Sequence, residues 1–159
     1  RRAGFDSVDL SATLRQLHEL YAPLAEDKGV RFSLEIAEPL EVRADAGLMF
    51  EAMSNLVSNA IKYNDKQEPW IEIGYDDQHP IEFYVRDNGI GIAAQHRERV
   101  FQIFKRLHER DAYGGGTGAG LAIARKIVAM HQGHLRIESE VGVGTTFHFD
   151  LSESLHASP

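Results

Sequence analysis

The stretch that decides the fold is residues 46–63, which read AGLMFEAMSNLVSNAIKY. Its apolar side chains recur at three- and four-residue steps, and this spacing predicts an amphipathic helix with one buried face. The buried face would be made by Met49, Met53, Leu56, Val57 and Ala60. Asp45 stands immediately before the helix, where its carboxylate can cap the free N–H groups of the first turn.

The opposite face of this helix carries a stripe of polar side chains. At about 100° per residue, one face collects Glu51, Asn55, Asn59 and Lys62. A polar stripe ordinarily faces water, but asparagine is a mediocre helix former, and two of them one turn apart indicate a further role. Amide oxygens can hold Mg²⁺ beside phosphates, and an ammonium can contact a phosphate oxygen. The stripe is therefore a candidate site for a phosphate-bearing ligand and a metal ion.

Further helices and strands are predicted on both sides of this helix. Apolar periodicity predicts helices over residues 9–28 and 120–131, whereas alternation of apolar and polar residues predicts strands. The predicted strands cover residues 30–36, 40–44, 71–73, 81–85, 135–137 and 147–151. Nearly all are apolar on one face only, which is typical of a sheet with helices on one side and water on the other. The expected fold is an α/β two-layer sandwich, a mixed sheet covered on one face by about three helices, rather than a doubly wound parallel sheet.

Length and composition restrict the class of protein. The 159 residues fit one domain, 1–159, and the absence of cysteine excludes disulfides and thiolate metal sites. No apolar run approaches the ~20 residues that span a bilayer, so no membrane contact is expected. The 17 basic and 24 acidic residues give a net charge of −7, which disfavours a nucleic-acid-binding surface. The chain begins Arg1-Arg2 without a methionine, which indicates a fragment of a longer protein.

A second motif, Asp87-Asn88-Gly89-Ile90-Gly91-Ile92, directly follows a predicted strand. An Asx-Gly turn at a strand end is its ordinary explanation. Alternatively, Gly89 and Gly91 would let the backbone approach a flat ligand closely, and a buried aspartate could accept a hydrogen bond from an exocyclic amine such as that of adenine. The motif is therefore a candidate base-binding site.

A third motif is the glycine-rich run 113–121, YGGGTGAGL, which opens the last predicted helix. Such runs are commonly flexible linkers, and we expect residues 105–120 to form a long mobile loop. At a helix N-terminus, however, free amides and the helix dipole form an anion site. This position favours a phosphate-binding role.

These three motifs, with Phe101-x-x-Phe104 and Gly142-x-Gly144-Thr145-Thr146-Phe147, follow one another in an order that resembles a known family. Over nearly the whole chain, the sequence is similar to the catalytic ATP-binding domain of sensor histidine kinases, which has the Bergerat fold. Residues 103–108 and 113–118 further resemble phytochrome-type kinases. More distantly, the same motifs resemble gyrase and MutL ATPases.

The resemblance implies a role for each matching residue in binding ATP and Mg²⁺. Asn55 would coordinate the metal, Glu51 would orient or deprotonate the attacking group, and Arg106 would reach the γ-phosphate. Lys62 would join these three as a catalytic residue near the phosphates. The remaining contacts to the nucleotide would come from Asn59, Tyr63, Asp87, Gly89, Gly91, Ile92, Phe104, Lys105, Gly116, Thr117, Gly118, Ala119, Gly120, Leu121 and Thr146. Of these, Thr146 would support Asp87 from the last strand.

The function that the resemblance implies is transfer of the γ-phosphoryl group of ATP to a histidine on a helical dimerisation domain of the same full-length kinase. A response regulator would act downstream, and the domain would be cytoplasmic and monomeric in isolation. Two alternatives remain open: an ATPase of the gyrase and MutL kind, and a non-enzymatic nucleotide-binding module. His18 imitates a phosphoacceptor site, but a strand-like pattern follows it, so we expect a helix surface residue there.

Overall fold

The computed structural model describes residues 5–37, 39–76, 82–102 and 120–151, and all structural statements concern these ranges. The elements in chain order are β1 (Asp6–Asp9), α1 (Leu10–Asp27), β2 (Arg31–Glu35), β3 (Glu41–Ala44), α2 (Ala46–Lys62), β4 (Trp70–Asp76), β5 (Glu82–Asp87), the 3₁₀ helices η1 (Ala94–His96) and η2 (Arg99–Phe101), α3 (Gly120–Met130), β6 (Leu135–Glu140) and β7 (Gly144–Asp150). The predicted helices and strands are all present, with ends that differ by a few residues.

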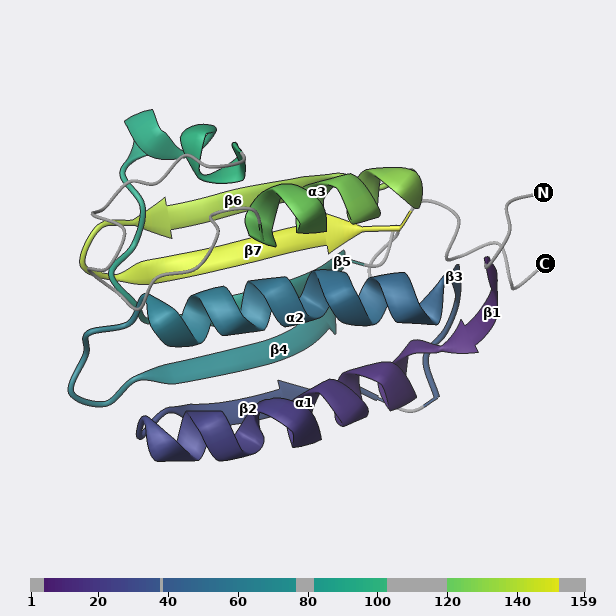
Figure 1. The fold of residues 1–159 in the computed structure, drawn as a ribbon, viewed down its shortest axis with the longest axis horizontal. Helices are drawn as coiled ribbons and strands as arrows, with labels where there is room; N and C mark the ends of the chain where they lie inside the picture. The colour runs from purple at the N-terminus through teal and green to yellow at the C-terminus, as the bar shows by residue number, and fades with distance from the viewer. Residues whose placement is uncertain (1–4, 38, 77–81, 103–119, 152–159) are drawn as a thin grey trace.

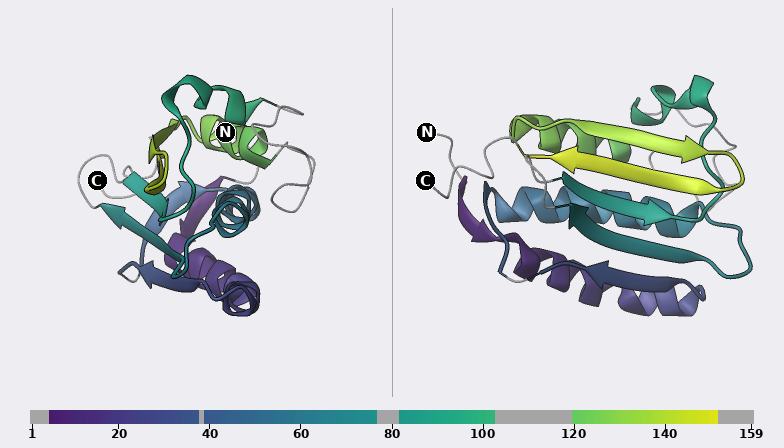
Figure 2. Two further views of the ribbon diagram at one scale, coloured as in Figure 1. Left: turned by 90° about the vertical axis from the view of Figure 1, so that its left-hand side faces the viewer. Right: turned by 180° about the vertical axis from the view of Figure 1, so that it is seen from behind.

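One five-stranded sheet forms the back layer, in the order β2-β4-β5-β7-β6. Strand β2 runs parallel to β4, whereas the other neighbouring pairs are antiparallel, so the sheet is mixed. Helices α1, α2 and α3 cover one face of this sheet, and the end-on view shows helices on one side and strands on the other (Figures 1 and 2). The two-layer α/β sandwich is therefore confirmed. A separate pair, β1 and β3, runs antiparallel beside it.

The two faces of the sheet differ because side chains alternate along each strand. On β5, Phe83 and Val85 are fully buried beneath the helices. On the opposite face, Tyr84 donates a hydrogen bond to Glu72 of β4 (2.6 Å), and the Arg86 guanidinium lies 4.6 Å from the centre of the Tyr84 ring. The helix-free face thus carries polar and charged contacts, as the alternating pattern predicts.

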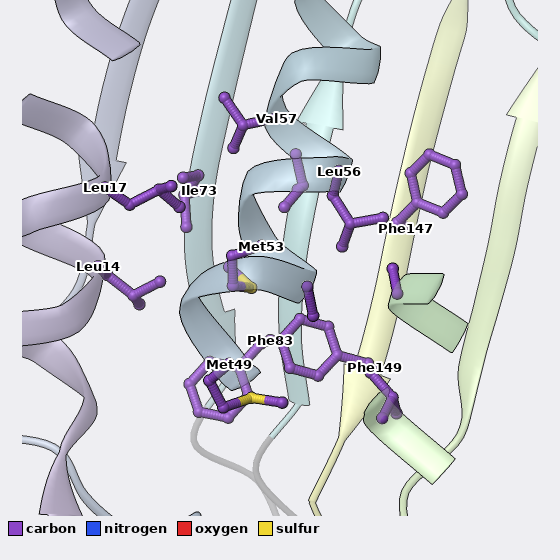
Figure 3. Close-up of a cluster of buried hydrophobic side chains, with 14 of the residues drawn as sticks. Leu14, Leu17, Met49, Met53, Leu56, Val57, Ile73, Phe83, Phe147 and Phe149 are labelled. Atoms are coloured by element: carbon purple, nitrogen blue, oxygen red, sulfur yellow. The ribbon is translucent and has the colours of Figure 1, made fainter. Parts of the chain in front are cut away.

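The core lies between α2 and the middle of the sheet, with α1 packed beside them (Figure 3). The side chains of Met49, Met53, Leu56 and Val57 on α2 are 0% exposed, as are Leu14 and Leu17 on α1. Burying such a side chain contributes about 1.5–3 kcal/mol relative to leaving it in water. This packing fixes the rotation of α2 and turns its polar stripe away from the sheet.

Side-chain hydrogen bonds fix the helix ends. Asp45 caps α2 by accepting the Leu48 N–H (3.0 Å), as predicted. The Asp45 N–H in turn donates to Nε2 of the buried His131 (3.1 Å), whose Nδ1 donates to the Ile127 carbonyl (2.8 Å). His131 follows the last turn of α3, so one imidazole joins the end of α3 to the start of α2.

Two features depart from the sequence-based expectations. His18 is half-buried rather than a free surface residue, since its Nε2 lies 2.9 Å from the Phe32 carbonyl and its ring packs on Phe32. Strand β1 and the 3₁₀ helices were not predicted, because segments of three or four residues are too short to show a period. Among the described residues, no helix is long and apolar enough to cross a membrane.

Candidate functional site

Three parts of the fold meet at the candidate site: the C-terminal half of α2, the loop after β5, and the first turn of α3. The Ile90 N–H donates to the Tyr63 carbonyl (3.1 Å), which joins the loop to the end of α2. A side chain at Gly120 would place its first carbon 3.3 Å from Oδ1 of Asn55, so the start of α3 lies against the polar stripe. Segments far apart in the sequence are thus brought together.

Exposure to solvent varies along the polar stripe of α2. Glu51 is exposed, whereas Asn55, Asn59, Lys62 and Tyr63 are half-buried. Because the opposite face of α2 is fixed in the core, these side chains have a defined direction. The stripe therefore offers amide oxygens and an ammonium beside the N-terminus of α3, where the N–H groups of the first turn have no partner within the helix and attract anions.

Asp87, the last residue of β5, is a buried carboxylate that is 8% exposed. Its Oδ1 accepts N–H groups from Gly89 (2.7 Å) and Thr145 (3.3 Å). Burial raises the pKa of Asp87 to about 6, while these N–H groups and the charge of Lys66 act in the opposite direction. The carboxylate is therefore mostly ionised at pH 7. Both of these N–H groups reach Oδ1, so Oδ2 is the oxygen that can accept from a ligand.

The two glycines of the loop after β5 pack closely against the protein's own backbone. A side chain at Gly89 would place its first carbon 2.4 Å from the Tyr63 carbonyl oxygen, and one at Gly91 would lie 2.1 Å from the Glu140 carbonyl oxygen. Gly91 also has a φ of +78°, which favours glycine. Close packing of the protein's own backbone therefore requires glycine at both positions, and the approach of a flat ligand to this loop stays a prediction.

The predicted role of Thr146 belongs to its neighbour. The register of β5 and β7 places Thr145 opposite Asp87 and Thr146 opposite Arg86. Because side chains alternate, Thr145 shares the buried face with Asp87, and Thr146 lies on the helix-free face. The Thr145 N–H donates to Asp87 and its hydroxyl lies 2.7 Å from that of Ser139. The support that we expected from Thr146 therefore comes from Thr145.

A polar network that the sequence analysis missed fixes the loop after β5. Asn88 Oδ1 accepts from Asn64 Nδ2 (2.9 Å) and from the Trp70 N–H (2.9 Å). On the other side, Ser139 Oγ accepts the Ile92 N–H (2.7 Å). The Asx-Gly turn in the sequence was the available signal for Asn88, whereas nothing local marks Ser139.

The other predicted site residues fall into two groups. Gly120 starts α3 beside Asn55, but Leu121 is 8% exposed within the hydrophobic core, so its side chain packs there. The remaining ones lie outside the described residues: Phe104, Lys105, Arg106, Gly116, Thr117, Gly118 and Ala119. In the part of the chain that the structure describes, no three histidine or carboxylate side chains gather as metal ligands.

Comparison with known proteins identifies the class to which this fold and site belong. Residues 44–155 match the family described as histidine kinase-, DNA gyrase B-, and HSP90-like ATPase, and the chain belongs to this family. It is 48% identical over 152 residues to cyanobacterial phytochrome B of Nostoc sp., which covers 94% of this chain and 20% of that protein. It is 34% identical over 146 residues to the aerobic respiration control sensor protein ArcB of Escherichia coli, and this alignment covers 88% of this chain and 18% of that protein.

Solved structures give the same assignment. The fold matches full-length ShkA in complex with AMPPNP with a TM-score of 0.84 and 27% identity, over 97% of this chain and 32% of that chain. It matches the catalytic domain of the histidine kinase ThkA with a TM-score of 0.80 and 27% identity, over 94% of this chain and 95% of that chain. The resemblance to the catalytic ATP-binding domain of sensor histidine kinases, including phytochrome-like ones, is confirmed. The chain spans about a fifth of the length of the curated relatives named above.

Proposed function

We propose that this chain binds Mg²⁺-ATP and transfers its γ-phosphoryl group to a histidine on a helical phosphoacceptor domain. The observation that carries this proposal is the approach of the first turn of α3 to Asn55, in a domain that also buries the carboxylate of Asp87. In this proposal, a carboxylate for the base and a polar, amide-rich surface for the phosphates would occupy the two ends of one site. The AMPPNP complex of ShkA supports a nucleotide as the ligand.

At the base end, Asp87 would recognise adenine. Its ionised Oδ2 can accept a hydrogen bond from the exocyclic amine, and a charged acceptor makes that bond about 1.5–3 kcal/mol strong. Guanine carries a carbonyl where adenine carries this amine, so it would present an acceptor to a carboxylate. The preference for adenine therefore follows from the chemistry of Asp87.

At the phosphate end, the residues present fit Mg²⁺ held together with phosphates. Mg²⁺ in such sites takes few protein ligands and completes its shell with phosphate oxygens and water. The Asn55 amide oxygen is a suitable ligand, and Lys62 would contact a phosphate oxygen beside the start of α3. When bound, Mg²⁺ would neutralise charge on the phosphates. Arg106 and the amides of residues 116–120 would complete the contacts to the triphosphate, and Lys105 lies next to them in sequence.

Glu51 would act on the acceptor. It is exposed on the same stripe, two turns before Asn59, so a side chain from another domain can reach it. Its carboxylate can orient the attacking imidazole and take its proton as the new N–P bond forms and the bond between the γ-phosphorus and the leaving oxygen of ADP breaks. Phosphoryl transfer depends mainly on such positioning and on charge neutralisation.

The acceptor would belong to the same full-length kinase, and a response regulator would receive the phosphoryl group next. The histidine kinase ThkA, solved in complex with the response regulator protein TrrA, supports this order of partners; it matches this chain with a TM-score of 0.76 and 26% identity, over 94% of this chain and 42% of that one. We further propose that residues 1–159 are one cytoplasmic catalytic domain, monomeric in isolation, which contacts neither membrane nor nucleic acid.

The proposal is tested by supplying labelled ATP, Mg²⁺ and a cognate helical hairpin to this chain. We expect label on the hairpin's histidine and none on the chain itself. Glu51→Gln should still bind ATP but should transfer little label. Binding of ATP without transfer to a genuine hairpin would favour the nucleotide-binding module, and absence of ATP binding would overturn both readings.

A further inference from the structure

Lys66, in the connection between α2 and β4, makes three hydrogen bonds through its ammonium group. The Nζ donates to the carbonyls of Asn88 (2.8 Å), Gly89 (3.1 Å) and Gly142 (2.8 Å). An ammonium has three N–H donors, so these contacts use all of them. Neither composition nor local sequence pattern marks this lysine, because all three partners are backbone atoms.

The three carbonyls come from two segments that define the base end of the site. Asn88 and Gly89 belong to the loop that follows Asp87, whereas Gly142 lies in the turn between β6 and β7. The Gly142 N–H also donates to the Ile90 carbonyl (2.8 Å), so the loop and the turn are joined directly as well. Lys66 thus bridges two segments whose relative position determines where Gly89 and Thr145 hold the carboxylate.

The connection that carries Lys66 is itself anchored. The Lys66 N–H donates to Oδ1 of Asn64 (3.0 Å), and the Asn64 amide donates to Asn88 (2.9 Å). The lysine therefore starts from a fixed backbone and reaches carbonyls at fixed positions.

Within the part of the chain that the structure describes, Lys66 is also a charged residue whose field acts on Asp87. The strands on either side place uncharged Ile71 and Thr145 opposite Asp87, and its bonded neighbour in the loop is Gly89. Among the described residues, the positive charge of Lys66 lowers the pKa of Asp87 against the effect of burial. Removing that charge would let Asp87 take up a proton at higher pH.

We propose that Lys66 is a positioning residue for adenine recognition, which holds the loop 87–91 against the β6–β7 turn so that Oδ2 of Asp87 faces the exocyclic amine. This inference rests on the proposed function, in particular on adenine binding by Asp87. Lys66 touches neither phosphate nor metal in this role. Its loss should therefore weaken adenosine, ADP and Mg²⁺-ATP by the same factor.

Calorimetric titration of adenosine and Mg²⁺-ATP at pH 6, 7 and 8 tests the proposal with three variants. Lys66→Met should weaken adenosine about ten-fold at pH 8, as for one lost charge-assisted contact, and by a larger factor at pH 6. Lys66→Gln keeps a donor without the charge, so it should bind better than Lys66→Met but show the same added pH dependence. Lys66→Arg should restore the pH dependence of the wild type. Lys28→Met, at an exposed residue directly after the C-terminal end of α1, is the matched control and should behave as wild type.

Several results would overturn the inference. Unchanged adenosine affinity in Lys66→Met would do so, as would a loss that grows from adenosine to Mg²⁺-ATP, because the latter indicates phosphate contact. A loss equal at pH 6 and 8 would assign Lys66 a merely structural role. If Lys66→Met does not fold, Lys66→Gln and Lys66→Arg still separate charge from geometry. Failure of the wild-type protein to bind adenosine at any pH would instead overturn the proposed function.

Discussion

Replacing Asp87 by asparagine should weaken adenine binding and stabilise the ligand-free domain at the same time. Asparagine can keep its oxygen toward the N–H groups of Gly89 and Thr145, but it then presents an amide N–H₂ where Oδ2 stood. That donor faces the adenine amine, which is also a donor. Loss of a charge-assisted bond of about 1.5–3 kcal/mol corresponds to roughly 10- to 150-fold weaker adenosine binding. ADP and ATP should lose the same factor, with or without Mg²⁺.

The gain in stability follows from the pKa of Asp87. Burial raises this pKa from the ordinary 3.8 to about 6, so the folded protein holds the proton more tightly than the unfolded chain does. Stability conferred by that proton is fully present below pH 3.8 and is lost as the pH rises through about 6. Above that pH, the buried charge costs about 3 kcal/mol, and roughly half of this remains at pH 5. Asp87→Asn carries no charge and should avoid that cost.

Urea unfolding of both proteins between pH 5 and 8, followed by the fluorescence of the single tryptophan, Trp70, measures this difference. We expect Asp87→Asn to be more stable than wild type at pH 8 and the difference to shrink as the pH falls. Adenosine titrations at pH 8 give the affinity. A variant that is less stable than wild type by the same amount at every pH would refute the argument from burial. Unchanged adenosine affinity would refute the assignment of Asp87 to the base.

Three further tests, two of them with a matched control variant, have distinct expected outcomes. Asn55→Asp adds negative charge beside the phosphates, so the binding defect measured by titration should grow from adenosine to Mg²⁺-ATP; an equal defect for both would contradict the metal role. Thr145→Val removes a buried hydroxyl and should cost about 1 kcal/mol of unfolding free energy in a urea titration, whereas Thr146→Val should change it by no more than about 0.5 kcal/mol. A larger loss of stability in Thr146→Val would instead favour Thr146 as the residue that supports Asp87. Gly91→Ala would bring a methyl group against the Glu140 carbonyl oxygen at a residue with positive φ, whereas Gly29 has a φ of +71° and nothing within 4 Å of an added methyl group. Thermal unfolding should therefore show Gly91→Ala to be less stable than Gly29→Ala by at least about 2 kcal/mol. Equal losses of stability would show that the loop adjusts easily to the added methyl group.

The helical layer and the sheet could be predicted well from the sequence, because the helical and the alternating spacing of apolar residues both reflect burial directly. Helix α2 is fixed by five apolar residues that all lie in the core, and strand β5 by the alternation of Phe83 and Val85 with Tyr84 and Arg86. Strand β1 escaped prediction because it has four residues and pairs only with β3, outside the main sheet. Short elements of this kind depend on their partners rather than on an amphipathic pattern of their own.

The candidate site was predicted less completely because its geometry depends on register and backbone contacts. The motif correctly marked a buried Asp87 at a strand end, but the choice between Thr145 and Thr146 required the pairing of β5 with β7. The reason for Gly91 required the position of Glu140, 49 residues along the chain. Lys66 could not be found at all, because a side chain that binds distant carbonyls leaves no pattern in the sequence.

The hydrogen bonds that hold the loop after β5 also affect how the domain unfolds. Its N–H groups at Gly89, Ile90 and Ile92 are bonded to Asp87, Tyr63 and Ser139, which belong to different elements of the fold. Breaking the bonds of Ile90 and Ile92 requires the loop to separate from the end of α2 and from β6, so their hydrogen exchange should proceed through unfolding of the whole domain rather than through local opening. A ligand that binds there then raises the unfolding free energy of the entire domain, by about 2.7 kcal/mol at 100 times its Kd. Melting temperature becomes a direct measure of occupancy, which makes this chain suited to nucleotide screening by thermal shift.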